Sequence, residues 1–96
     1  MDVKINAVHF DASESLKSFI EKKVGKMSRF FDGIVKADVS LKVEKPETAK
    51  NKAVALRVMV PGEELYADKV ADSFEEAVDL CVAALEKQLV KYKEKQ

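Results

Sequence analysis

The spacing of hydrophobic residues along the chain predicts four strands and two helices. Apolar and polar residues alternate over residues 3–10, 37–44, 53–60 and 64–71, the period-two pattern of strands with one buried face. Apolar residues recur instead at three- and four-residue spacing over about residues 13–30, and again from residue 74, as in amphipathic helices. The predicted order is β-α-β-β-β-α.

Capping and turn residues agree with the boundaries of the predicted helices and strands. Asp11 or Ser13 can cap the first helix, and Ser73 followed by Glu76 forms a capping box at the start of the second. Pro61-Gly62 predicts a tight turn between the third and fourth strands. Because short connections join the last three strands, we expect them to form an antiparallel meander.

These elements predict an α+β fold in which two helices pack on one face of a four-stranded sheet. A length of 96 residues fits a single domain, residues 1–96, with one hydrophobic core. A ferredoxin-like βαββαβ fold is excluded, because no strand pattern follows the last helix.

Composition excludes several classes of protein. The hydrophobic fraction of 47% is too high for a disordered chain, and no apolar run approaches the roughly 20 residues of a membrane span. The N-terminal stretch alternates, unlike the apolar region of a signal peptide. The single cysteine, Cys81, rules out an internal disulfide and a cysteine-rich metal cluster. We therefore expect a cytoplasmic protein with no membrane partner.

Charge is balanced overall but unevenly distributed. The chain holds 17 Lys and Arg against 17 Asp and Glu, a formal net charge of +0. Residues 63–79 hold seven acids and one lysine, whereas residues 13–36 hold six cations and three acids, and residues 87–96 hold four lysines and one acid. Such clustering is typical of polyanion binding, although exposed helix lysines are also ordinary solubilising residues.

A helical projection places the cations of both basic segments on exposed faces. Lys22, Lys26 and Arg29 lie at i, i+4 and i+7, opposite the apolar stripe of the first helix. Lys91 and Lys95 share a row on the second helix. Because both helices are expected on the same face of the sheet, their cations can contact phosphate groups together. The cations of the two segments, which are the candidates for phosphate contacts, are Lys22, Lys23, Lys26, Arg29, Lys87, Lys91, Lys93 and Lys95.

The residues offer little for catalysis or metal binding. His9 is the only histidine and stands at the end of a predicted strand, without a partner in the local sequence. Cys81 lies on the apolar stripe of the second helix, where a buried structural role is expected instead of a reactive thiol. The carboxylates of residues 68–79 lack the spacing and the glycine of an EF-hand. We therefore predict no enzymatic activity, no catalytic residue, no metal site and no cofactor.

Three segments of the chain resemble one protein family in order and spacing. They are LKSFIEKKVGKMSRFFDGI at 16–34, ADVSLKVEK at 37–45, and ELYADKVADSFEEAVDLCVAALEKQLVKYKEK at 64–95. Together they are similar to the bacterial ribosome hibernation-promoting factors, also called the ribosome-associated inhibitor or sigma-54 modulation family. The similarity extends over essentially the whole chain.

The resemblance implies a fold like that of a double-stranded-RNA-binding domain and a function without catalysis. Family members bind the small ribosomal subunit, in the channel used by messenger RNA and the anticodon ends of transfer RNA, and repress translation in stationary phase or stress. Basic residues of the two helices contact ribosomal RNA there. By position, the resemblance implies this role for Lys23, Lys26, Lys87, Lys91, Lys93 and Lys95. Lys22 and Arg29 are added on charge and helical position.

Two positions depart from the family pattern. Ala84 stands where a basic residue is common, one turn before Gln88, and Glu75 replaces a frequent aromatic residue. The chain resembles the short form of the family, which lacks the C-terminal dimerisation domain, and we expect a monomer away from the ribosome. In some bacteria this form acts with a separate ribosome modulation factor to pair ribosomes.

Other functions stay open at this point. The first alternative is a domain that binds a structured RNA outside the ribosome. A less favoured one is an acylphosphatase-like hydrolase, which would need a final strand and a phosphate-binding arginine loop. DNA is not an expected partner in any of these interpretations.

Overall fold

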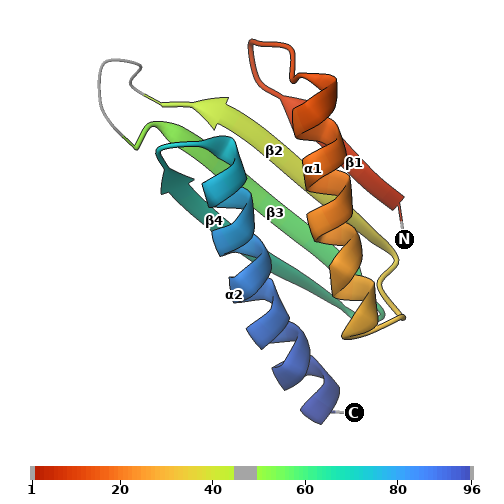
Figure 1. Cartoon of the computed structure of the whole chain (residues 1–96). Helices are drawn as coiled ribbons and strands as arrows, with labels where there is room; N and C mark the ends of the chain where they lie inside the picture. Colours follow the sequence, from red (N-terminus) through yellow and green to blue (C-terminus); the bar gives the residue numbers. More distant parts are fainter. Residues whose placement is uncertain (1, 45–49, 96) are drawn as a thin grey trace.

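The computed structural model describes residues 2–44 and 50–95 and confirms the predicted order of elements (Figure 1). The elements are β1 (Asp2–Ala7), α1 (Glu14–Gly25), the 3₁₀ helix η1 (Lys26–Arg29), β2 (Lys36–Val43), β3 (Lys52–Val60), β4 (Glu63–Ala71) and α2 (Phe74–Glu94). The first helix differs from expectation, because its regular α-helical part ends at Gly25 and its last turn is the tighter η1. β1 also ends early, since the chain turns before His9, which has φ 62°.

The four strands form one sheet in the order β1-β2-β3-β4. β2, β3 and β4 are consecutive antiparallel neighbours, which confirms the expected meander. Gly62 takes the positive φ of 78° in the turn between β3 and β4, a conformation that glycine adopts without steric cost. β1 lies at the edge of the sheet and pairs with β2 in parallel. β1 and β4 therefore point in the same direction.

Both helices cover the same face of the sheet, as predicted (Figure 1). α1 follows β1, α2 follows β4, and each helix runs back along the strand that precedes it. Because those two strands point the same way, the two helices also point the same way (Figure 1). Their C-terminal ends, which carry the two basic segments, therefore lie at the same end of the molecule.

The hydrophobic core fills the space between the helices and the sheet. α1 and η1 contribute Ile20, Val24 and Met27, whose side chains are fully buried. The buried stripe of α2 consists of Phe74, Ala77, Val78, Cys81, Val82, Leu85, Leu89 and Tyr92. The sheet contributes alternate residues, among them Val39, Leu41, Val54, Leu56 and Val58. The pattern of apolar positions thus predicted the core correctly, including the burial of Cys81.

Both helices begin at serine caps. The Ser13 Oγ accepts a hydrogen bond of 3.1 Å from the Leu16 N–H, so Ser13 and not Asp11 caps α1. The Ser73 Oγ accepts one of 3.1 Å from the Glu76 N–H, as expected for α2. Over the described residues, no helix combines the length and the apolar character needed to cross a membrane.

The last turn of α2 joins the ends of three elements. The Tyr92 hydroxyl donates a hydrogen bond to the Pro61 carbonyl in the β3–β4 turn. The Tyr92 ring also meets the Phe31 ring edge-on, with centroids 5.2 Å apart. Phe31 lies against Gly33, where an added Cβ would come within 2.6 Å of the Phe31 ring. These contacts hold the end of η1 against the end of α2.

Candidate nucleic-acid interface

Three cations of the first helical segment stand on its exposed side. Lys22 lies in the last turn of α1, and Lys26 and Arg29 lie in η1. A 3₁₀ helix has about three residues per turn, so Lys26 and Arg29, three positions apart, are aligned along one row. The opposite side of this segment is buried in the core, which keeps the three cations at the surface.

Lys23 is placed differently, because it faces α2. Its Nζ lies 3.4 Å from the Asp79 Oδ1 and 5.5 Å from the centroid of the Phe19 ring. Its side chain is 33% exposed. Lys23 therefore contributes an ion pair between the two helices, and its charge is offset by the Asp79 carboxylate.

Lys93 lies on the flank of α2 that faces α1. Its Nζ donates a 2.8 Å hydrogen bond to the Phe30 carbonyl, just beyond η1. The last carbonyls of a helix lack partners within the helix, and a lysine is a suitable donor for them. Lys93 therefore links the two cationic helix ends directly.

The other lysines of α2 lie on its outer side and on the flank next to β4. The Gln88 side-chain amide donates a 2.8 Å hydrogen bond to the Tyr66 carbonyl of β4, which defines this flank. Lys91 and Lys95 follow Gln88 along the same row, and Lys95 Nζ lies 3.9 Å from Glu63 Oε1. The cations of α2 are thus divided between two flanks and do not form one ridge.

Six of the eight predicted residues have no carboxylate partner in the described part of the chain, and one of the six, Lys93, donates to the Phe30 carbonyl instead. The ion pairs found there are Lys17–Glu14, Lys23–Asp79, Arg57–Glu64 and Lys95–Glu63. The five exposed cations outside these pairs and outside the Lys93 contact are Lys22, Lys26, Arg29, Lys87 and Lys91. Their charges are available to an external anion.

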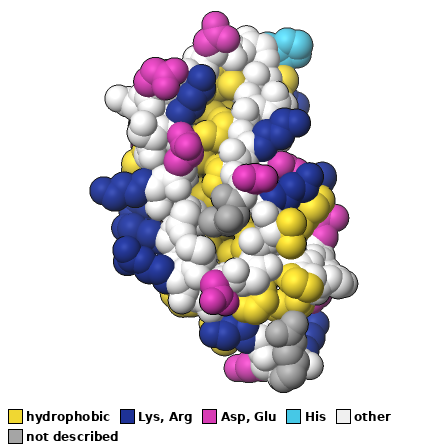
Figure 2. Space-filling model, turned by 90° about the vertical axis from the view of Figure 1, so that its right-hand side faces the viewer, with side chains coloured by type: hydrophobic (Ala, Val, Ile, Leu, Met, Phe, Trp, Pro, Cys, Tyr) yellow, Lys and Arg dark blue, Asp and Glu magenta, His cyan; other side chains and the backbone are white. Residues whose placement is uncertain are grey.

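One group of acidic residues lies at the end of the molecule opposite the cationic end. Asp72, Glu75 and Glu76 are at the start of α2, where carboxylates complement the helix dipole. Figure 2 shows dark-blue side chains gathered on the left, which is the helix-covered side, and magenta side chains near its top. The helix-covered side therefore carries negative charge at the start of α2 and positive charge at the C-terminal ends of both helices.

The residues weighed for catalysis are not assembled into a site. His9 is exposed at the opposite end, in the turn after β1. Cys81 is fully buried, and its thiol lies 3.4 Å from the Val54 carbonyl oxygen. Burial, together with a smaller effect of the nearby Asp68 carboxylate, raises the pKa of Cys81 to about 11, while Lys69 opposes the shift. A thiol with this pKa is protonated near neutral pH and is a poor nucleophile.

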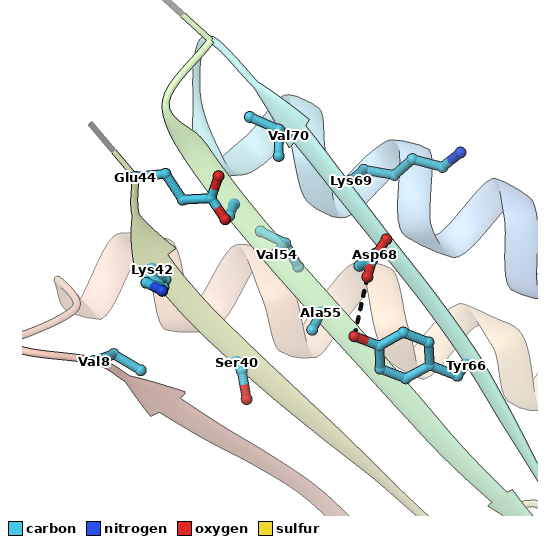
Figure 3. Close-up of a pocket in the computed structure, with 11 residues that line it drawn as sticks. Val8, Ser40, Lys42, Glu44, Val54, Ala55, Tyr66, Asp68, Lys69 and Val70 are labelled. Atoms are coloured by element: carbon cyan, nitrogen blue, oxygen red, sulfur yellow. Dashed lines mark hydrogen bonds between the residues drawn. The ribbon is translucent and has the colours of Figure 1, made fainter. Parts of the chain in front are cut away.

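The open face of the sheet carries a shallow hollow of about 390 Å³ (Figure 3). Ala53 and Ala55 of β3 leave the space, and Tyr66 of β4 borders it, with its hydroxyl donating a 3.1 Å hydrogen bond to Asp68. Lysines and carboxylates both stand around the rim, as Figure 3 shows for Lys42 and Asp68. With charges of both signs, this face lacks the cation excess that a polyanion requires.

Burial of Tyr66 and its bond to Asp68 raise the pKa of the phenol.

Comparison with known proteins identifies the family to which the chain belongs. The family described as "Sigma 54 modulation protein / S30EA ribosomal protein" matches residues 3–96. The chain belongs to this family. The resemblance inferred from the sequence is thereby confirmed.

Two curated members of the S30EA family illustrate the similarity. A ribosome hibernation promoting factor of Azotobacter vinelandii is 34% identical over 96 residues, which cover 100% of this chain and 86% of that protein. A ribosome hibernation promotion factor of Bacillus subtilis (strain 168) is 30% identical over 103 residues, which cover 99% of this chain and 50% of that protein.

Solved structures of similar proteins have the same architecture. A ribosomal subunit interface protein from Coxiella burnetii superposes with a TM-score of 0.87 and 29% identity, covering 98% of this chain and 99% of that one. The N-terminal domain of Thermus thermophilus Protein Y superposes with a TM-score of 0.83 at 22% identity, over 96% of this chain and 99% of that one. The second comparison supports the fold alone.

The two departures from the S30EA pattern have distinct structural settings. Ala84 is half-buried against the core, one turn before Gln88 on the flank of α2 next to β4. A basic residue there would lengthen the row of Lys91 and Lys95. Glu75 is exposed in the first turn of α2, at the end opposite the cations. Neither residue disturbs the cationic end itself.

Sequence reasoning missed the internal partners of Lys23 and Lys93. One signal was available, because Glu75, Asp79 and Glu86 fall on the same flank of α2 as Lys93 at helical spacing. An acidic row on that flank is suited to a neighbouring basic helix. The roles of the eight cations in RNA binding remain predictions.

Proposed function

We propose that this protein is a ribosome hibernation factor that binds ribosomal RNA of the small subunit through the C-terminal ends of α1 and α2. Occupation of the mRNA and tRNA decoding channel would block decoding and repress translation in stationary phase or stress. The protein acts by binding, without catalysis and without a cofactor, in the cytoplasm where ribosomes work.

One structural observation carries the proposal beyond family membership. The parallel course of α1 and α2 brings two basic segments, more than fifty residues apart in sequence, to one end of the molecule. RNA is a dense polyanion, and cations that neutralise its phosphates release condensed counterions. The acidic start of α2 favours one orientation, in which the C-terminal helix ends enter the RNA first.

The remaining features of the proposal concern partners. A monomer is proposed to bind a single small subunit, because the cationic end of one chain already contains residues from both helices. Pairing of ribosomes would then depend on a separate ribosome modulation factor. The family resemblance, and no feature of the sheet or helices, supports that partner.

The salt dependence of binding tests the electrostatic basis. If the five unpaired cations each neutralise one phosphate, the slope of log affinity for isolated small subunits against log salt should be about −3.5 to −4.5. Fluorescence anisotropy of labelled protein over a series of KCl concentrations measures this slope. Binding that is independent of salt would point to an apolar protein contact and contradict the proposal.

Charge reversal tests whether the two helix ends form one site. Lys22→Glu with Lys26→Glu, and separately Lys87→Glu with Lys91→Glu, should abolish both binding to small subunits and inhibition of translation in vitro. All four residues are exposed, so each change should alter the free energy of unfolding by no more than about 0.5 kcal/mol.

The open face of the sheet provides a matched control. Lys4 and Lys42 are exposed there, and Lys4→Glu with Lys42→Glu makes the same change in net charge. This double variant should retain most of the binding. If it lost binding while both helix variants bound like the wild type, the working surface would lie on the strands.

A further inference from the structure

Two consecutive phenylalanines at the end of the first helical segment have opposite environments. Phe31 packs against the core and meets the Tyr92 ring at a centroid distance of 5.2 Å. Phe30 is 42% exposed to solvent. The core therefore accounts for Phe31, and packing gives no reason for an aromatic residue at position 30.

The backbone of Phe30 is held on both sides. Its N–H donates a 3.0 Å hydrogen bond to the Met27 carbonyl, and its carbonyl accepts a 2.8 Å bond from Lys93 Nζ. Met27 is fully buried, and Lys93 belongs to α2. The exposed ring of Phe30 thus projects from a backbone that is anchored to both helices, which lowers the entropy that an additional contact would cost.

Cations border Phe30 from both helices. Arg29 precedes it, Lys26 lies in the turn before, and Lys93 contacts its carbonyl oxygen. An exposed aromatic ring inside a basic surface is suited to an unpaired base, because the ring stacks on the base while the cations contact the flanking phosphates. Double-stranded RNA would not present such a base, since its bases are stacked inside the helix.

We propose that Phe30 stacks on an unpaired base of the RNA, so that the protein prefers RNA with a splayed or single-stranded nucleotide at this point. The inference rests on the proposed function, because it assigns a base contact to the same cationic end. The phosphate contacts of Lys26 and Arg29 supply affinity, and Phe30 selects the local RNA conformation.

Salt dependence separates a stacking contact from a phosphate contact. Phe30→Ala should weaken binding to small subunits about 5- to 150-fold at every salt concentration, while the slope of log affinity against log salt stays that of the wild type. Lys26→Ala should instead reduce the magnitude of the slope by about 0.7 to 0.9. Phe30→Tyr should bind with the affinity of the wild type, because it keeps the aromatic ring.

Val70 offers a matched control on the open face of the sheet, where it is 45% exposed. Val70→Ala should leave both affinity and slope unchanged. Thermal unfolding of each variant should show that the fold is intact, since neither side chain belongs to the buried core.

Photocrosslinking identifies the class of molecule that meets Phe30. With p-azidophenylalanine at position 30, irradiation of the complex with small subunits should link the protein to ribosomal RNA, and the same group at position 70 should not. A crosslink to a ribosomal protein, no crosslink from position 30, or Phe30→Ala binding like the wild type would each overturn the inference. If the wild-type protein failed to bind small subunits at all, the proposed function would fail with it.

Discussion

The ion pair between Lys23 and Asp79 leads to a prediction in which loss of an acid improves function. The Lys23 Nζ and Asp79 Oδ1 atoms are 3.4 Å apart, and the side chains are 33% and 51% exposed. An ion pair with this exposure stabilises the fold by less than about 1 kcal/mol. Asp79→Asn should therefore cost little stability, while Lys23 keeps its position over the Phe19 ring.

The gain in RNA affinity can be estimated from counterion release. A Lys23 freed from its carboxylate partner could neutralise one further phosphate, which steepens the slope of log affinity against log salt by about 0.7 to 0.9. If the additional contact contributes nothing near 1 M salt, this slope corresponds to about four- to fivefold tighter binding near 0.15 M salt. Such a change lies within the resolution of an anisotropy titration against purified small subunits.

Two controls separate this local effect from a general change in charge. Glu76→Gln removes one negative charge from the first turn of α2, one turn before Asp79, where the carboxylate forms no ion pair in the described residues, and should leave the slope unchanged. Asp79→Asn in a Lys23→Met background should bring no gain, because no cation is then released. Equal gains from Glu76→Gln and Asp79→Asn, or no gain from Asp79→Asn, would refute the assignment of Lys23 as a latent phosphate contact.

Two further predictions concern the fold. Burial raises the pKa of Cys81 to about 11 from 9.0, so the folded state holds the thiol proton more tightly than the unfolded state. The resulting stabilisation of the fold is complete below about pH 9 and is lost as the pH rises to about 11. The wild-type protein should therefore lose about 2 kcal/mol more unfolding free energy between about pH 8 and pH 10.5 than Cys81→Ala does. Equal losses in the two proteins, measured by urea unfolding at both pH values, would contradict this. Tyr92→Phe removes the hydrogen bond to the Pro61 carbonyl but keeps the ring contact with Phe31, so it should lower the free energy of unfolding by about 0.5–1.5 kcal/mol, and an unchanged urea midpoint would show that this bond contributes nothing.

The sequence by itself determined the elements and the core of this protein. The alternation in β2, β3 and β4 and the helical spacing in α2 correctly predicted which side chains are buried, because these periods follow directly from backbone geometry. Ser73 with Glu76 and Pro61-Gly62 likewise marked a helix start and a turn through local chemistry alone. The two basic segments could also be recognised as clusters in the sequence, as could the family resemblance.

Hydrophobic spacing was less informative at the end of the first helix, where α-helical and 3₁₀ geometries are both compatible with the same few residues. The apolar spacing continued through Met27 and suggested one helix, yet the segment after Gly25 tightens into η1. Both geometries bury Met27, so hydrophobic spacing does not distinguish them. The consequence is functional, because the tighter turn aligns Lys26 with Arg29.

Only the tertiary structure decided how the charged residues meet. The parallel pairing of β1 with β2 gives α1 and α2 the same direction, and this long-range choice leaves no periodic signal in either strand. The rotation of α2 about its axis is set by its packing on β3 and β4, and it turns Lys93 toward Phe30 and Gln88 toward Tyr66. Local sequence specifies which residues can be exposed on a helix, whereas the partner that each exposed residue faces depends on contacts between segments far apart in the chain.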